Sequence, residues 1–101
     1  MVNKIALVLF VFLQVQCSSV WANDVFSGRK VYLRECASCH GARGEGKLPG
    51  MLNFQESQTL FKTNSTLADI VRDGKGIMPS FNGLISDEDI SNVIAYLRTF
   101  L

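Results

Sequence analysis

Two cysteines and a histidine lie close together in the run from Cys36 to His40, which reads Cys-Ala-Ser-Cys-His. Two thiols three positions apart can add across the two vinyl groups of haem, and a histidine directly after the second thiol is then placed to bind the iron. The run therefore predicts one covalently bound haem c, with thioethers at Cys36 and Cys39 and an axial imidazole from His40. Such a group would form part of the core around which the chain folds.

Two other chemistries use closely spaced cysteines. A redox-active dithiol usually follows a strand in an α/β unit, and the sequence contains no convincing alternating strand pattern. A zinc site needs four ligands, whereas the chain beyond residue 22 offers two cysteines and one histidine. Haem attachment is therefore the favoured interpretation, with dithiol or metal chemistry as the alternatives.

The sixth iron ligand cannot be a second histidine from the same chain, because His40 is the only one. Methionine is the common alternative, and it raises the reduction potential. Met78 lies in a loop rich in glycine, far beyond His40, whereas Met51 is closer in sequence and harder to carry to the opposite face of a haem. We predict His40 and Met78 as the iron ligands; the alternatives are ligation by Met51, or gap-filling in an apolar core for either methionine.

The first 22 residues have the pattern of a secretory signal peptide. A basic start at Lys4 precedes an apolar run from Ile5 to Leu13, and a small residue, Ala22, stands at the expected cleavage position. The apolar run falls short of the roughly 20 residues that a membrane-spanning helix needs. We expect cleavage after Ala22, which leaves residues 23–101 as one exported domain with no stable membrane insertion.

Cys17 lies within this segment and raises the alternative of a lipidated N-terminus. Lipoprotein signals place small residues before the cysteine, whereas Val15 and Gln16 stand there in this chain.

The net charge gives no indication of a nucleic-acid partner, because 10 basic and 9 acidic residues leave the chain close to neutral. A small, neutral domain without a disulfide framework needs another source of stability, and a prosthetic group can supply it.

Hydrophobic periodicity predicts an all-α domain of three to five helices joined by loops. The first helix covers residues 28–34 and is capped by Asp24 or Ser27, and a short helix is expected over residues 57–62. A further helix is expected to open at Ser65 or Thr66 and to end at Gly74. Glycine and proline predict loops over residues 41–50 and 74–83.

The C-terminal segment gives the clearest helical signal. Ser86 followed by Asp89 resembles a capping box. The apolar residues after it recur at helical spacing; they are Ile90, Val93, Ile94, Leu97 and Leu101.

With the runs from Cys36 to His40 and from Gly76 to Pro79, the chain resembles the small class I c-type cytochromes over nearly all of residues 23–101. The resemblance implies the small cytochrome c fold, wrapped around one haem. It also implies that the first and last helices cross near a glycine and close the haem pocket. The glycine and aromatic residue of the first helix correspond to Gly28 and Tyr32, and the aromatic-aliphatic pair of the last helix corresponds to Tyr96 and Leu97.

The same resemblance implies that the carbonyl of Pro49 accepts a hydrogen bond from His40, although the local order Leu-Pro-Gly-Met differs from the usual pattern. Trp21 would leave with the signal segment, so no tryptophan remains to contact a haem propionate.

Two filled axial positions leave no coordination site for a substrate, so we expect a one-electron carrier and not an enzyme. Signal-directed export places it in the periplasm, or in the thylakoid or another lumen of a photosynthetic organism. We expect a monomer that docks briefly with redox proteins, a reductase or dehydrogenase as donor and an oxidase or terminal reductase as acceptor. A local patch could steer these partners; it consists of Lys30, Arg43, Lys47 and Lys75.

Two alternatives stay open. The protein could be a haem subunit fixed in a larger redox complex. It could also be a haem-based sensor or small enzyme in which a labile Met78 gives way to an external ligand, although no acid-base pair is evident beside the loop.

Overall fold

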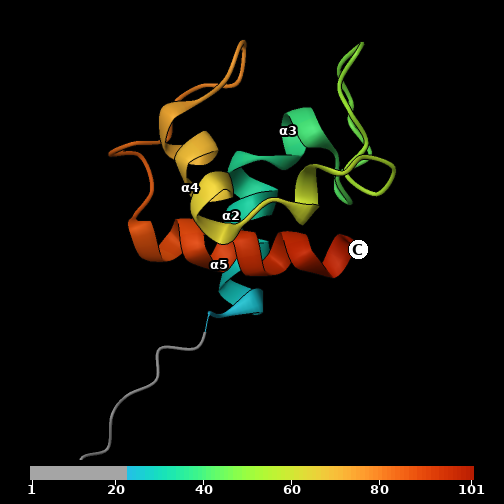
Figure 1. Cartoon of the computed structure of the whole chain (residues 1–101). Coiled ribbons are helices and arrows are strands. Elements are labelled where there is room, and N and C mark those ends of the chain that lie inside the picture. The colour runs from blue at the N-terminus through green and yellow to red at the C-terminus, as the bar shows by residue number, and fades with distance from the viewer. Residues whose placement is uncertain (1–22) are drawn as a thin grey trace, which may run out of the picture.

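Two helices cross in the computed structural model, which describes residues 23–101. They are α2 (Val25–Glu35) and α5 (Asp87–Leu97), the first and the last α-helix of this part of the chain (Figure 1). The crossing lies at Gly28, where a Cβ atom would overlap the backbone carbonyl of Asn92. The predicted crossing near this glycine is confirmed, because only a residue without a side chain lets the two backbones approach so closely.

In Figure 1 the elements between α2 and α5 lie on one side of α5, and the last element of the chain continues α5 at its C-terminal end. They are α3 (Ala37–His40), the 3-10 turn η1 (Thr59–Phe61), α4 (Asn64–Asp73) and the C-terminal 3-10 turn η2 (Arg98–Phe100). Residues 23–101 contain no strand, only isolated bridges between Lys75 and Met78 and between Asn82 and Ile85. The predicted all-α class is confirmed. No helix within this range is long and apolar enough to cross a membrane.

The helix starts follow local capping chemistry. Asp24 caps α2, since its carboxylate accepts hydrogen bonds from the N–H groups of Phe26 and Ser27 at 2.9 and 3.2 Å. At α5 the predicted capping box between Ser86 and Asp89 is confirmed.

Several sequence-based boundaries were wrong. Helix α2 begins at Val25 and not at Gly28, and the short helix expected over residues 57–62 is only the 3-10 turn η1. Helix α4 begins after Thr63, whose hydroxyl accepts from the N–H of Thr66, and not at Ser65 or Thr66. Leu101 lies beyond α5 and is 62% exposed, so it does not continue the apolar stripe. The stripe ends at Leu97 because the chain tightens into η2 after it.

The core consists of two apolar clusters that share α5. The first packs α2 against α5; its buried members are Val31, Tyr32, Phe54, Leu60, Val93 and Leu97. The second packs α4 against α5; its buried members are Leu67, Val71, Phe81, Ile90 and Ile94. The helix α5 therefore joins the part of the fold that carries Cys36 to His40 to the part that carries Met78.

A larger residue at position 28 should separate the crossing helices. We expect Gly28→Ala to lower the free energy of unfolding by about 1–3 kcal/mol, since overpacking against a rigid backbone outweighs the helix propensity of alanine. Chemical denaturation followed by circular dichroism measures this change. Arg29→Ala, at an exposed position of the same helix, is the control and should stay within about 0.5 kcal/mol of the wild type. Equal stability of the Gly28 variant and the wild type would contradict the close crossing.

Candidate functional site

A cavity of about 570 Å³ opens between the two halves of the fold. Its size lies within the range of roughly 300–1,000 Å³ typical of cofactor and ligand sites, and most of its lining is apolar. All four sequence-predicted site residues reach it; they are Cys36, Cys39, His40 and Met78. Met51 also lines the cavity, so lining alone does not separate the two methionines.

One wall of the cavity is the helical turn that follows α2. The N–H of Cys36 donates to the carbonyl of Tyr32 at 2.8 Å, and the N–H of His40 donates to the carbonyl of Cys36 at 3.0 Å. These bonds hold both thiols and the imidazole of His40 on one turn. Cys36 and Cys39 are half-buried free thiols, and burial raises the pKa of Cys36 to about 11. A reactive dithiol has the opposite property, a lowered thiol pKa.

The imidazole of His40 is half-buried and stacks on the ring of Phe54, with 4.8 Å between ring centroids and 19° between planes. Burial lowers the pKa of His40, which favours the neutral form that binds metals. Its Nδ1 atom is buried without a hydrogen-bond partner. Nothing in the sequence pattern singled out Phe54 as a neighbour of His40.

The implied hydrogen bond between His40 and Pro49 is absent from this structure, since Nδ1 has no partner and Pro49 is exposed. The reason lies in the backbone between them. The N–H of Gly46 donates to the carbonyl of His40 at 2.7 Å, and the N–H of Lys47 donates to the carbonyl of Cys39 at 2.9 Å. Residues 46 and 47 therefore pair with the turn itself, and Pro49 lies beyond the cavity lining.

Tyr32 connects α2 to the end of this turn. Its side chain is 1% exposed, and its hydroxyl donates to the carbonyl of Gly41 at 2.6 Å. The rings of Tyr96 and Phe100 pack edge-on against it at centroid distances of 5.3 and 5.4 Å. Tyr32 and Leu97 line the cavity, whereas Tyr96 lies outside the lining and supports Tyr32 from behind.

The loop after α4 forms another part of the cavity wall. The backbone groups of Lys75 and Met78 exchange hydrogen bonds of 3.1 and 3.0 Å, which closes a tight turn. The N–H of Phe81 then returns to the carbonyl of Val71 at 3.1 Å. Met78 is half-buried against the cluster shared by α4 and α5. In Figure 1 this loop, in orange, and the green loop after α3 stand on opposite sides of the molecule.

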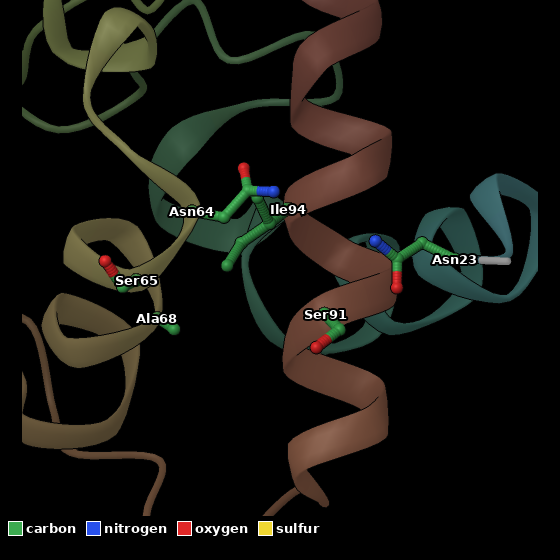
Figure 2. Close-up of a pocket in the computed structure, with 6 residues that line it drawn as sticks. All are labelled: Asn23, Asn64, Ser65, Ala68, Ser91 and Ile94. Atoms are coloured by element: carbon green, nitrogen blue, oxygen red, sulfur yellow. The ribbon is translucent and has the colours of Figure 1, made fainter. Parts of the chain in front are cut away.

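Charged side chains reach the cavity at its edges; they are Glu35, Lys62 and Lys75. All four lysines and arginines of the predicted steering patch are exposed, but of these only Lys75 lines the cavity. A smaller pocket of about 180 Å³ lies elsewhere, between α4, α5 and the start of the described chain (Figure 2). It contains none of the predicted site residues.

Comparisons with known proteins found a matching family model and several similar sequences. Residues 23–97 match a family described as cytochrome c oxidase, cbb3-type, subunit III. The chain is 36% identical to a cytochrome c6 of Thermostichus vulcanus, over 95% of this chain and 85% of the relative. It is 37% identical to a cytochrome c6 of Parathermosynechococcus lividus, over 73% of this chain and 87% of the relative.

A solved structure shows the same likeness. The structure of cytochrome c6 from the diatom Phaeodactylum tricornutum superposes with a TM-score of 0.65 at 33% identity, covering 75% of this chain and 92% of that one. The arrangement of helices around the cavity is therefore shared as well as the sequence.

Proposed function

Because this chain belongs to the small class I c-type cytochromes, we propose that it is an exported one-electron carrier whose haem c is held by Cys36, Cys39, His40 and Met78. Proteins of this family contain one covalently bound haem c and are electron carriers rather than enzymes. The bound group supplies an iron that changes between Fe(II) and Fe(III). The residues of the chain then decide how that iron is ligated and buried.

One observation carries the proposal: the thiols, the imidazole and Met78 line a single cavity although they come from separate segments. The residues present fit a haem. The thiols are free to form thioethers, and the imidazole of His40 lines the same cavity, where burial lowers its pKa and favours the neutral, metal-binding form. The walls between them are apolar and tightly buried at Leu60 and Val93, which are 0% and 1% exposed.

We favour Met78 over Met51 as the second ligand because axial ligands must approach the iron from opposite faces. The backbone of Met51 lies close to Gly46, which is itself hydrogen-bonded to His40. Met51 therefore belongs to the same side as the imidazole. Met78 enters from the loop after α4, which is anchored independently through Phe81.

The chain then performs three tasks. His40 and Met78 would hold the iron of a bound haem and would leave no coordination site on it for a substrate. The apolar cavity wall excludes water and fixes the environment of the iron. Cys36 and Cys39 are half-buried on a turn whose Ser38 is exposed, so a haem attached there would have its thioether edge near the surface, where a redox partner could approach. The partners we propose are a reductase or dehydrogenase as donor and an oxidase or terminal reductase as acceptor.

We further propose that residues 1–22 are a signal peptide that directs the domain of residues 23–101 to the periplasm or to a lumen. The basic start, the short apolar run and Ala22 support this. These residues, with Cys17 and Trp21, lie outside the part of the chain that the structure describes.

Carbon monoxide separates a carrier from a sensor or small enzyme. A six-coordinate carrier should show no rapid binding of carbon monoxide to the reduced protein at neutral pH, because Met78 blocks the iron. Stopped-flow spectroscopy of the purified haem-loaded protein measures this. Rapid, complete binding at neutral pH would contradict the carrier proposal and favour a labile Met78.

A second candidate is a haem subunit held in a larger redox complex, since the matching family is described as a subunit of an oxidase. Purification of the native protein after detergent-free lysis distinguishes the two. A carrier should elute alone, whereas a fixed subunit should elute with a stoichiometric partner.

A further inference from the structure

The loop that carries Met78 is tied back onto the C-terminal end of α4. The hydroxyl of Ser80 donates a hydrogen bond to the carbonyl oxygen of Arg72. The N–H of Asn82 donates to the same carbonyl at 3.3 Å, and it also lies 3.3 Å from Ser80 Oγ. These bonds fasten the residues directly after Met78 to the last turn of a helix that belongs to the core.

Gly74 closes the other side of the loop. It ends α4 with a φ of 76°, and its N–H donates to the carbonyl of Ile70 at 2.8 Å. A Cβ atom at this position would lie 2.5 Å from the carbonyl oxygen of Met78 and 2.8 Å from the backbone nitrogen of Ser80. The returning backbone of the loop therefore packs directly on Gly74, and both the dihedral angle and the lack of space require glycine.

The anchor point itself is held from two sides. The guanidinium of Arg72 is paired with Asp87 at 2.9 Å and with Asp69 at 3.4 Å. Such exposed pairs contribute little stability individually. The pair with Asp87 nevertheless links α4 to the first turn of α5, so the carbonyl that receives Ser80 sits on a braced helix end.

We propose that Ser80 and Gly74 are positioning residues for Met78, which hold its loop against the cavity and thereby set how readily Met78 leaves the iron. This inference rests on the proposed ligation by Met78. Neither Ser80 nor Gly74 lines the cavity, so their effect on ligand exchange would act through the position of the loop.

Ligand exchange on the oxidised protein reports the opening of this loop. When imidazole binds, the iron–sulfur bond to Met78 breaks as an iron–nitrogen bond forms, and no electron is transferred. The apparent affinity for imidazole rises with the fraction of molecules in which the loop has opened. Loss of one net hydrogen bond should raise that fraction about three- to tenfold.

The experiment titrates the oxidised, haem-loaded protein with imidazole and follows the loss of the far-red thioether-to-iron absorption band. We expect Ser80→Ala to bind imidazole about three- to tenfold more tightly than the wild type, with the band still present before imidazole is added. Ser80→Thr keeps a hydroxyl and should restore nearly the wild-type affinity. Gly74→Ala should also bind imidazole more tightly than the wild type. If the Gly74 variant does not fold, the Ser80 variants alone test the proposal.

Two controls separate positioning from general stability. Thr63→Ala removes the cap at the opposite end of α4, so it should lower global stability and leave the imidazole affinity unchanged. Ser91→Ala removes an exposed hydroxyl of α5 beside the small pocket (Figure 2) and should change neither property.

The outcomes are distinguishable. Equal imidazole affinity of wild type and Ser80→Ala, or an equal shift in Thr63→Ala, would overturn the positioning role alone. A wild-type protein without the far-red band would overturn the ligation by Met78, and the positioning role with it.

Discussion

Replacing Cys39 by alanine is expected to abolish stable covalent haem and to leave little folded protein. The cavity of about 570 Å³ is bounded by core residues of both apolar clusters, among them Leu60, Val71 and Val93. Left empty, it would deprive these side chains of contacts on one side, and a domain of this size has little stability in reserve. The haem is in this sense a part of the core.

The measurement for the Cys39 variant combines the haem content after denaturing electrophoresis with far-ultraviolet circular dichroism. Ser38→Ala is the matched control, because Ser38 lies between the two thiols and is exposed; it should retain both haem and helicity. Folded, haem-free Cys39→Ala protein with full helicity would refute the structural role of the haem.

Replacing Met78 by alanine is expected to have a different effect, because the thioethers and His40 remain. The haem should stay bound, the far-red band should disappear, and the reduced protein should bind carbon monoxide rapidly. The reduction potential should fall by on the order of 100 mV, because thioether ligation favours Fe(II). At 59 mV per tenfold this corresponds to a change of roughly fiftyfold in the equilibrium between the two oxidation states.

Met51→Ala is the control for this prediction, because Met51 lines the same cavity. It should keep the far-red band and a potential close to that of the wild type. If the absorption spectrum and the reduction potential changed in Met51→Ala but not in Met78→Ala, the iron ligand would be Met51.

Much of the fold could be predicted because it follows from local chemistry. The capping box at Ser86 and the glycine that ends α4 are each encoded within a few residues, and both are where the sequence placed them. The start of α4 was misplaced because Thr63, Ser65 and Thr66 are all good caps, and local sequence does not rank them. The crossing at Gly28 came from the family resemblance, since its physical cause, the backbone of Asn92, is far away in sequence.

The candidate site was predictable in its residue types and less so in its surroundings. The spacing from Cys36 to His40 encodes attachment chemistry directly, whereas the stacking of Phe54 on His40 depends on how the loop between them folds. The expected hydrogen bond from His40 to the carbonyl of Pro49 is absent for the same reason, because the backbone of this loop is hydrogen-bonded to the turn that carries Cys39 and His40. The hydrogen bond from the Ser80 hydroxyl to the carbonyl of Arg72, which holds the Met78 loop, joins residues that are eight positions apart. No sequence motif predicts it.

A potentiometric titration of the purified native protein, followed by its haem absorption, tests the central claim most directly. The account predicts one reversible, one-electron transition, with the far-red band present in the oxidised form at neutral pH and lost on reduction. An irreversible transition, or an oxidised protein without that band, would contradict a six-coordinate electron carrier ligated by His40 and Met78.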